Sequence, residues 1–179
     1  TAVVVGLMSV LLVIRHTRTD EEDGRIEMVR SLPVGRLSNV AATLLVLFLV
    51  NIVLAVLTGI SLYALNIESM ELEGSLLYGA ALGATGMIFA SLTAVCAQLS
   101  HNARSAMGLS IGILLLAYIV RAIGDVGSEA VAWLSPLGWI VRSEVYVNNI
   151  WWPVLLTVGA AINFGALAKP LSTDELVAK

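Results

Sequence analysis

The sequence predicts an all-α integral membrane protein, a polytopic helical bundle of about five transmembrane segments. Hydrophobic residues make up 58% of the 179 residues and charged residues 13%, and the mean hydropathy is +0.91. These values lie outside the usual range for a soluble globular domain. The apolar residues also form long uninterrupted runs, which a bilayer requires and a soluble core does not.

Five apolar segments are predicted to span the membrane, at about residues 1–14, 40–65, 75–99, 105–123 and 150–168. The second and third contain 26 and 25 residues without a charge, enough to cross about 30 Å of hydrocarbon. The first is expected to be truncated at its start, so that 1–179 forms part of one transmembrane domain.

An outer interfacial segment is predicted at residues 124–149. Its apolar stretch, residues 131–141, is only eleven residues long and is interrupted by Pro136 and Gly138. Such a stretch is too short to cross the bilayer, so we expect a re-entrant or interfacial element.

The basic residues predict the orientation, because Lys and Arg are retained on the cytoplasmic side. Residues 15–36 contain five Arg, whereas residues 66–74 contain three Glu and no basic residue. Summed over the predicted topology, eight basic residues lie inside and two outside. Loop 15–39 is therefore predicted to be cytoplasmic.

A charged stretch, residues 19–36, separates the first two apolar segments. Its five acidic and three basic side chains would cost on the order of 20 kcal/mol or more at the bilayer centre, so it lies in water or against another protein. Thr19 and Glu22 form a capping-box pattern, and Pro33 disfavours continuation, which predicts an amphipathic helix at 20–31. The sequence leaves open whether this helix is a solvated connector or a docking surface.

Small residues recur at helical spacing as Gly79-x-x-x-Gly83 in the third apolar segment and Gly108-x-x-x-Gly112 in the fourth. This spacing lets helix backbones approach closely. Close packing inside one bundle is favoured over a dedicated dimer interface.

A few polar residues lie in or near the apolar segments. Asn51 and Asn163 are costly there without partners, so we expect them to line a polar pathway or to form interhelical hydrogen bonds. Arg121 and Asp125 are four residues apart near an outer end and are predicted to form an ion pair, either an ordinary interfacial one or one lining an exit path.

Several chemistries lack the residues they need. No G-x-x-x-x-G-K-[ST] phosphate loop occurs, and His16 and His101 have no neighbours that would make a metal-ligand pair such as H-E-x-x-H. We therefore expect no catalytic, cofactor-binding or metal site in this chain, and a membrane-embedded enzyme is disfavoured.

The charged stretch also carries a resemblance to a known family. The pattern Glu22-x-Gly24-x-x-Glu27-x-x-x-x-x-Pro33-Val34-x-Arg36, after one apolar segment and before a longer one, resembles the cytoplasmic loop of ABC-2 type transporter permeases. Three longer blocks resemble more narrowly the first half of the exporters of polyketide antibiotics, the tetronasin-resistance type; the blocks are RHTRTDEEDGRIEMVRSLPVGR, GSLLYGAALGATGMIFASLTAVCAQLSHNARSAMGLS and SPLGW…WWPVLL.

The resemblance implies the membrane permease of an ATP-driven ABC exporter that moves a hydrophobic or amphipathic compound, such as a polyketide-type antibiotic, outward. Helix 20–31 would be a coupling helix that docks on an ATP-binding subunit. The residues expected in this coupling contact are Glu21, Glu22, Gly24, Arg25, Glu27, Met28, Pro33 and Arg36. An ion-gradient-driven secondary transporter or channel is the alternative, although the five apolar segments contain no Asp or Glu.

The resemblance also implies the partners and the location. ATP and Mg would be bound by the ATP-binding subunit, expected as a homodimer, and no cofactor by this chain. The other partners would be the remaining half of the permease or a second permease copy, and the lipid bilayer, with no nucleic acid. The location would be the plasma membrane of a bacterium or archaeon.

Overall fold

The computed structural model describes residues 1–19, 36–65, 71–100, 102–127 and 129–168. All regular elements within these ranges are helical. They are α1 (Ala2–Ile14), the π-helix η1 (Arg15–Thr19), α4 (Arg36–Ala64), α5 (Leu72–Leu99), α6 (Ala103–Val126), α7 (Glu129–Ala132), α8 (Pro136–Val141) and α9 (Trp152–Leu167). The all-α prediction is confirmed.

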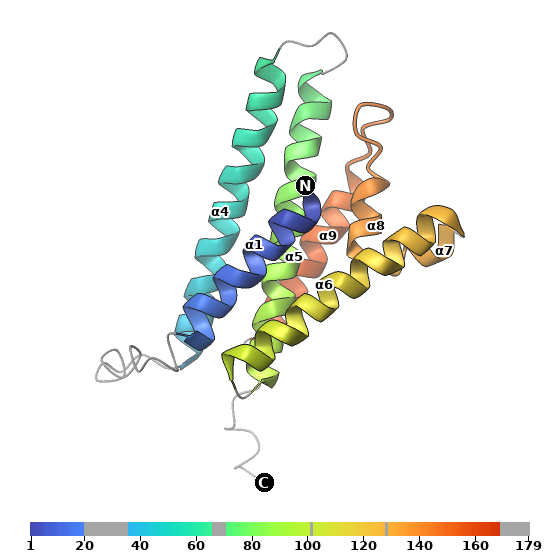
Figure 1. Cartoon of the computed structure of the whole chain (residues 1–179). Helices are drawn as coiled ribbons and strands as arrows, with labels where there is room; N and C mark the ends of the chain where they lie inside the picture. The colour runs from blue at the N-terminus through green and yellow to red at the C-terminus, as the bar shows by residue number, and fades with distance from the viewer. Residues whose placement is uncertain (20–35, 66–70, 101, 128, 169–179) are drawn as a thin grey trace.

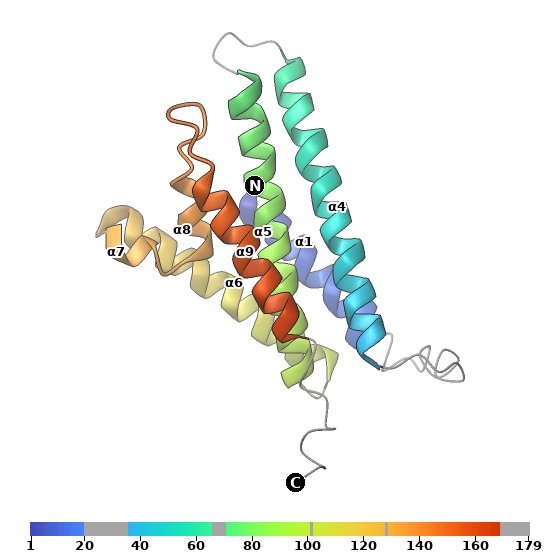
Figure 2. The same cartoon turned by 180° about the vertical axis from the view of Figure 1, so that it is seen from behind.

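Helix α5 lies at the centre of the bundle. Figures 1 and 2 show α4 along one side of it, α1 and α6 crossing one face, and α9 covering the opposite face. Every residue from Gly74 to Gln98 is buried or half-buried. Many of them are Gly, Ala, Ser or Thr, the small residues that allow close helix packing inside a membrane.

Among the described residues, three helical stretches are long and apolar enough to cross a bilayer: Ala41–Ala64, Leu72–Leu99 and Ala103–Val126. The first and last predicted segments form shorter apolar helices, Ala2–Thr17 and Trp152–Leu167. Large apolar side chains on α4 and α6 point outward, including Leu45 and Leu116, each 61% exposed. In water such faces would be unfavourable, whereas in a bilayer they contact lipid.

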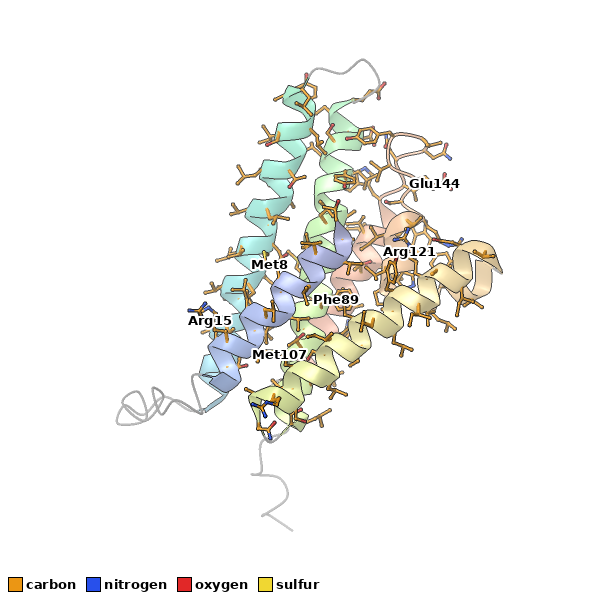
Figure 3. All side chains as sticks on the ribbon, in the orientation of Figure 1. Met8, Arg15, Phe89, Met107, Arg121 and Glu144 are labelled. Atoms are coloured by element: carbon orange, nitrogen blue, oxygen red, sulfur yellow. The ribbon has the colours of Figure 1, made fainter. Side chains whose placement is uncertain are left out.

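The main packed core forms where α1 and α6 cross α5. Phe89 of α5 lies there, 1% exposed, in one cluster with Ile14 of α1, Leu114 of α6 and Ala161 of α9. Figure 3 labels Phe89 between the α1 and α6 ribbons. This cluster joins α1, α6 and α9 to the central helix.

One end of the bundle, which we call the basic end, collects several helix termini. Figure 1 shows η1, the start of α4, the turn between α5 and α6, and the end of α9 at this end. Arg15 and Arg104 are exposed here, and the Gln98 side chain of α5 donates a hydrogen bond to the Ala168 carbonyl after α9. Residues 19 and 36, which flank the undescribed segment 20–35, both lie at the basic end.

The predicted outer segment 124–149 contains the last turn of α6, the short helices α7 and α8, and turns. Ser135, just before α8, fixes this region to the bundle by donating a hydrogen bond to the Ala117 carbonyl of α6 (2.6 Å).

Candidate functional site

The predicted coupling residues fall mainly on the part of the chain that the structure leaves undescribed. Glu21, Glu22, Gly24, Arg25, Glu27, Met28 and Pro33 lie outside the described residues, and Arg36 is the first residue of α4. The structure does describe both attachment points of their segment. These are η1 and the start of α4, which lie at the basic end.

The chain changes from α-helix to π-helix where α1 ends. The π-helical turn covers Arg15–Thr19, and the buried Thr17 hydroxyl donates a hydrogen bond to the Val13 carbonyl (2.7 Å). π-Helices are rare and occur frequently at functional sites. The sequence analysis did not predict this turn.

A pocket of about 330 Å³ lies next to this turn, between α1 and α4. Its lining is apolar apart from one imidazole and one hydroxyl. The lining residues are Leu12, His16, Ala42, Thr43, Val46, Leu47 and Val50.

The backbones of helices α4 and α5 approach each other so closely that no Cβ atom would fit between them at several glycines. A Cβ atom added to Gly79 would overlap the Ala55 carbonyl oxygen, and one added to Gly83 would lie 2.8 Å from the Asn51 carbonyl oxygen. Further along, a Cβ on Gly59 would lie 3.1 Å from the Leu76 Cα. We call this contact the α4–α5 seam.

The second predicted glycine pair has different surroundings. Gly108 and Gly112 lie on an exposed face of α6, where an added Cβ would have no atom within 4 Å. The two pairs share a spacing in sequence, but only Gly79 and Gly83 lie in a close helix contact within the described structure.

Asn51 lies fully buried in the α4–α5 seam. Its Nδ2 donates a hydrogen bond to the Leu47 carbonyl one turn earlier (2.9 Å), and its Oδ1 has no hydrogen-bond partner. A Cβ added to Gly86 would overlap this oxygen. Gly86 therefore provides the space that the Asn51 amide occupies.

Asn163 is exposed on α9 and donates a hydrogen bond to the Gly159 carbonyl of the same helix (2.8 Å). This donated hydrogen bond, like that of Asn51, lies within one helix. Buried hydroxyls in α5 and α9 follow the same pattern. The hydroxyls of Thr85, Ser91, Thr93 and Thr157 donate to the carbonyls of Ala81, Met87, Phe89 and Pro153, at 2.9, 3.0, 2.7 and 2.8 Å.

An aromatic cluster ties the region around α8 to the start of α9. The rings of Trp133 and Trp152 stack with centroids 5.1 Å apart, and the Arg142 guanidinium lies 4.8 Å from the centre of the Trp133 ring. Trp139 donates from Nε1 to the Trp133 carbonyl (2.6 Å). Stacked rings with a cation over one face stabilise this arrangement.

A tight turn covers residues 143–150, closed by a hydrogen bond from the Ile150 amide to the Ser143 carbonyl (2.8 Å). Three of its non-glycine residues are in the left-handed region: Glu144 (φ 44°), Tyr146 (φ 66°) and Asn149 (φ 48°). Such conformations cost free energy for residues with a Cβ. Contacts elsewhere must therefore hold the turn in place.

The start of α5 supplies these contacts. The Tyr146 hydroxyl is 3.3 Å from the Ser75 hydroxyl, and the Tyr146 ring lies over Gly74, where an added Cβ would be 2.5 Å from ring atom Cδ1. Trp151 also donates a hydrogen bond to the Glu73 carboxylate (3.3 Å). The 143–150 turn is thus docked on the end of the central helix.

The predicted pair on α6 is in contact, with Arg121 Nε 3.5 Å from Asp125 Oδ2. Figure 3 labels Arg121 on α6 and Glu144 on the 143–150 turn. The two side chains are 31% and 47% exposed, so the pair contributes little to stability. Among the described residues no group of three or more His, Cys, Asp or Glu side chains could hold a metal ion.

The fold and these contacts define an all-α polytopic membrane protein with an apolar outer surface and a centrally buried helix. A family model described as "Multidrug efflux system permease Rv1217c, C-terminal domain" matches residues 1–168. The chain belongs to this family.

One curated relative is the multidrug efflux system permease protein Rv1217c of Mycobacterium tuberculosis (strain ATCC 25618 / H37Rv). It is 39% identical over 164 residues, which cover 92% of this chain and 29% of the relative. The chain thus spans less than a third of the length of that protein. The match supports an ABC-2-like efflux permease, but it gives no support to the narrower polyketide-exporter type, and the family description names a C-terminal domain rather than a first half.

Sequence reasoning missed the α1–α4 pocket, the aromatic cluster and the role of Gly86. The cluster had a visible signal, because Trp133, Trp139, Trp152 and the basic Arg142 all fall within twenty residues. The pocket had none, since it depends on the angle at which two helices diverge.

Proposed function

We propose that this chain is the membrane-spanning permease part of an ATP-driven efflux system. ATP hydrolysis takes place on a separate subunit. The observation that carries the proposal is the match of residues 1–168 to a multidrug efflux permease domain. The compound moved would be hydrophobic or amphipathic, with a polyketide-type antibiotic as the narrower case that the sequence resemblance suggests. An ion-gradient-driven transporter or channel remains the alternative.

The covalent connections support this route of coupling. The segment 20–35, which holds the predicted coupling helix, links η1 directly to α4. A partner that displaced this segment would pull on both helices at once. The exposed Arg15 and Arg104 at the same end support a cytoplasmic side there, because basic residues are retained inside.

The partners in this proposal are an ATP-binding homodimer, which would bind ATP and Mg, and further permease structure. This chain would bind no cofactor itself. Further permease structure, as the rest of a longer chain or as a second copy, is supported by the greater length of the relative, of which this chain covers 29%. The location would be the plasma membrane of a bacterium or archaeon, crossed several times, with loop 15–39 in the cytoplasm.

The test is export of a fluorescent amphipathic dye from cells or reconstituted vesicles that contain the complete transporter. We expect Glu27→Lys and Gly24→Pro each to abolish export without reducing the amount of protein in the membrane. Gly112→Ala is the control, because an added Cβ there meets no atom within 4 Å, and it should export normally.

The energy source separates the leading proposal from its alternative. Depletion of ATP should stop export while an ionophore that collapses ion gradients leaves it running. Export that survives ATP depletion and stops with the ionophore would establish the secondary transporter instead. Normal export by both loop variants would refute the coupling role of residues 20–31.

A further inference from the structure

We propose that the pocket between α1 and α4 binds an anionic phospholipid, with one acyl chain in the pocket and the phosphate headgroup at Arg15 and His16. The inference stands apart from the proposed function, since it concerns a lipid that the protein retains rather than a compound that it moves.

The pocket has the size and lining of a binding site for an alkyl chain. Its volume of about 330 Å³ lies at the lower end of the roughly 300–1,000 Å³ that is usual for small-molecule pockets. Leu12 of α1 and Val46, Leu47 and Val50 of α4 provide apolar walls. A chain of methylene groups can fill such a space without leaving a polar atom unpaired.

The pocket exists because α1 and α4 diverge while both pack on α5. Figures 1 and 2 show the two helices approaching each other at the basic end and separating away from it. Leu47 is 3% exposed and lies in one buried cluster with Ala90 and Ala94 of α5, so α5 backs the pocket. Val46 and Val50 are 56% and 41% exposed, which leaves the pocket open toward the surrounding lipid.

Polar groups are confined to the basic end of the pocket. His16 lies in η1 and Thr43 one turn before Val46 and Leu47 on α4, so the polar lining precedes the apolar lining along the bundle. This order matches an amphiphile whose head is at the membrane boundary and whose tail points into the hydrocarbon. The π-helical turn contains His16, which lines the pocket.

An exposed basic side chain next in sequence to the pocket lining favours an anionic head. Arg15 precedes His16 and is exposed, and Figure 3 labels it beside α4 at this end. A guanidinium binds a phosphate with two parallel hydrogen bonds, and basic pockets between transmembrane helices bind anionic lipid headgroups.

The experiment measures lipid retention by native mass spectrometry, with the whole protein purified from its membrane and exchanged into mixed micelles. The probes are dioleoyl phosphatidylglycerol and dioleoyl phosphatidylcholine, which share acyl chains and differ in head charge. We expect one phosphatidylglycerol to be retained about tenfold more than phosphatidylcholine, which corresponds to about 1.4 kcal/mol. Both heads contain a phosphate, but the choline cation of phosphatidylcholine leaves that head without net charge and repels the Arg15 guanidinium.

Two matched pairs of variants locate the lipid. Val46→Trp fills the pocket and should abolish retention, whereas Leu49→Trp, at a 54% exposed position of α4 outside the lining, should not. Arg15→Gln should remove the preference for phosphatidylglycerol, whereas Arg104→Gln, also at the basic end, should keep it. Val50→Trp is a second pocket-filling variant in case Val46→Trp fails to fold.

Each outcome decides the proposal. Loss of retention in the pocket-filling variants alone, together with loss of preference in Arg15→Gln alone, supports it. Equal retention of the two lipids by the unaltered protein would overturn it, as would retention that the pocket-filling variants leave unchanged. Because no transport is measured, a failure here leaves the proposed function standing.

Discussion

The contact between Gly86 and Asn51 allows a sharp test of the α4–α5 seam. In Gly86→Ala the new Cβ would overlap Asn51 Oδ1 and lie 2.5 Å from Cγ and 3.0 Å from Nδ2. All three of these nearest atoms belong to one side chain. Overpacking of this kind costs about 1–3 kcal/mol, so Gly86→Ala should be destabilised by that amount.

Removal of the Asn51 side chain should restore the stability that Gly86→Ala loses. Asn51→Ala loses a hydrogen bond to a carbonyl in its own helix but also removes a buried oxygen that has no partner, so alone it should change stability by less than about 1 kcal/mol. The double variant should recover most of the loss, which corresponds to a coupling free energy of about 1–3 kcal/mol.

The assay is reversible unfolding in mixed micelles, followed by tryptophan fluorescence. It compares the unaltered protein, Gly86→Ala, Asn51→Ala and the double variant. Gly83→Ala is the control, because its added Cβ would meet the Asn51 backbone oxygen at 2.8 Å, which Asn51→Ala leaves in place. Rescue of Gly86→Ala but not of Gly83→Ala is the expected result. A double variant as unstable as Gly86→Ala would refute the assignment of the clash.

Three further predictions use the same unfolding assay. Gly79→Ala should be destabilised by about 1–3 kcal/mol because its Cβ would overlap a backbone oxygen. The stability of Gly112→Ala should change by less than about 0.5 kcal/mol. Equal losses in the two variants would contradict the difference between a close helix contact at Gly79 and open space at Gly112. Glu144→Gly should raise stability by up to about 1 kcal/mol, since φ is 44° there, and a marked loss would argue against backbone strain. Arg142→Gln should lower stability by about 0.5–2 kcal/mol through the lost contact with the Trp133 ring, and an unchanged midpoint would show that this contact adds nothing.

Hydropathy was enough to locate the helices but not their ends. The predicted segment 40–65 corresponds to α4, which begins at Arg36, and the predicted segment 105–123 corresponds to α6, which runs to Val126 and includes Asp125. Charged residues are tolerated in the last turns because those turns can lie beyond the hydrocarbon. Hydropathy therefore locates the apolar part of each helix and stops short of its termini.

The glycine pairs show what spacing alone leaves undecided. Gly79–Gly83 and Gly108–Gly112 have the same pattern, but one faces α4 and the other an open surface. The direction in which a helix face points depends on its tilt and on its neighbours. One signal was available: Gly79, Gly83 and Gly86 follow at intervals of four and three residues, which is one continuous stripe along a helix.

The α4–α5 seam has a mechanical consequence. Side chains between two helices can change rotamer and so absorb a small displacement, but at Gly79 the backbones themselves are in contact. Helix α4, about 44 Å long at 1.5 Å per residue over its 29 residues, is therefore stiffly joined to the central helix. A force applied near Arg36 would move α4 and α5 as one rigid body. The 143–150 turn, which is docked on the far end of α5, would be displaced with them.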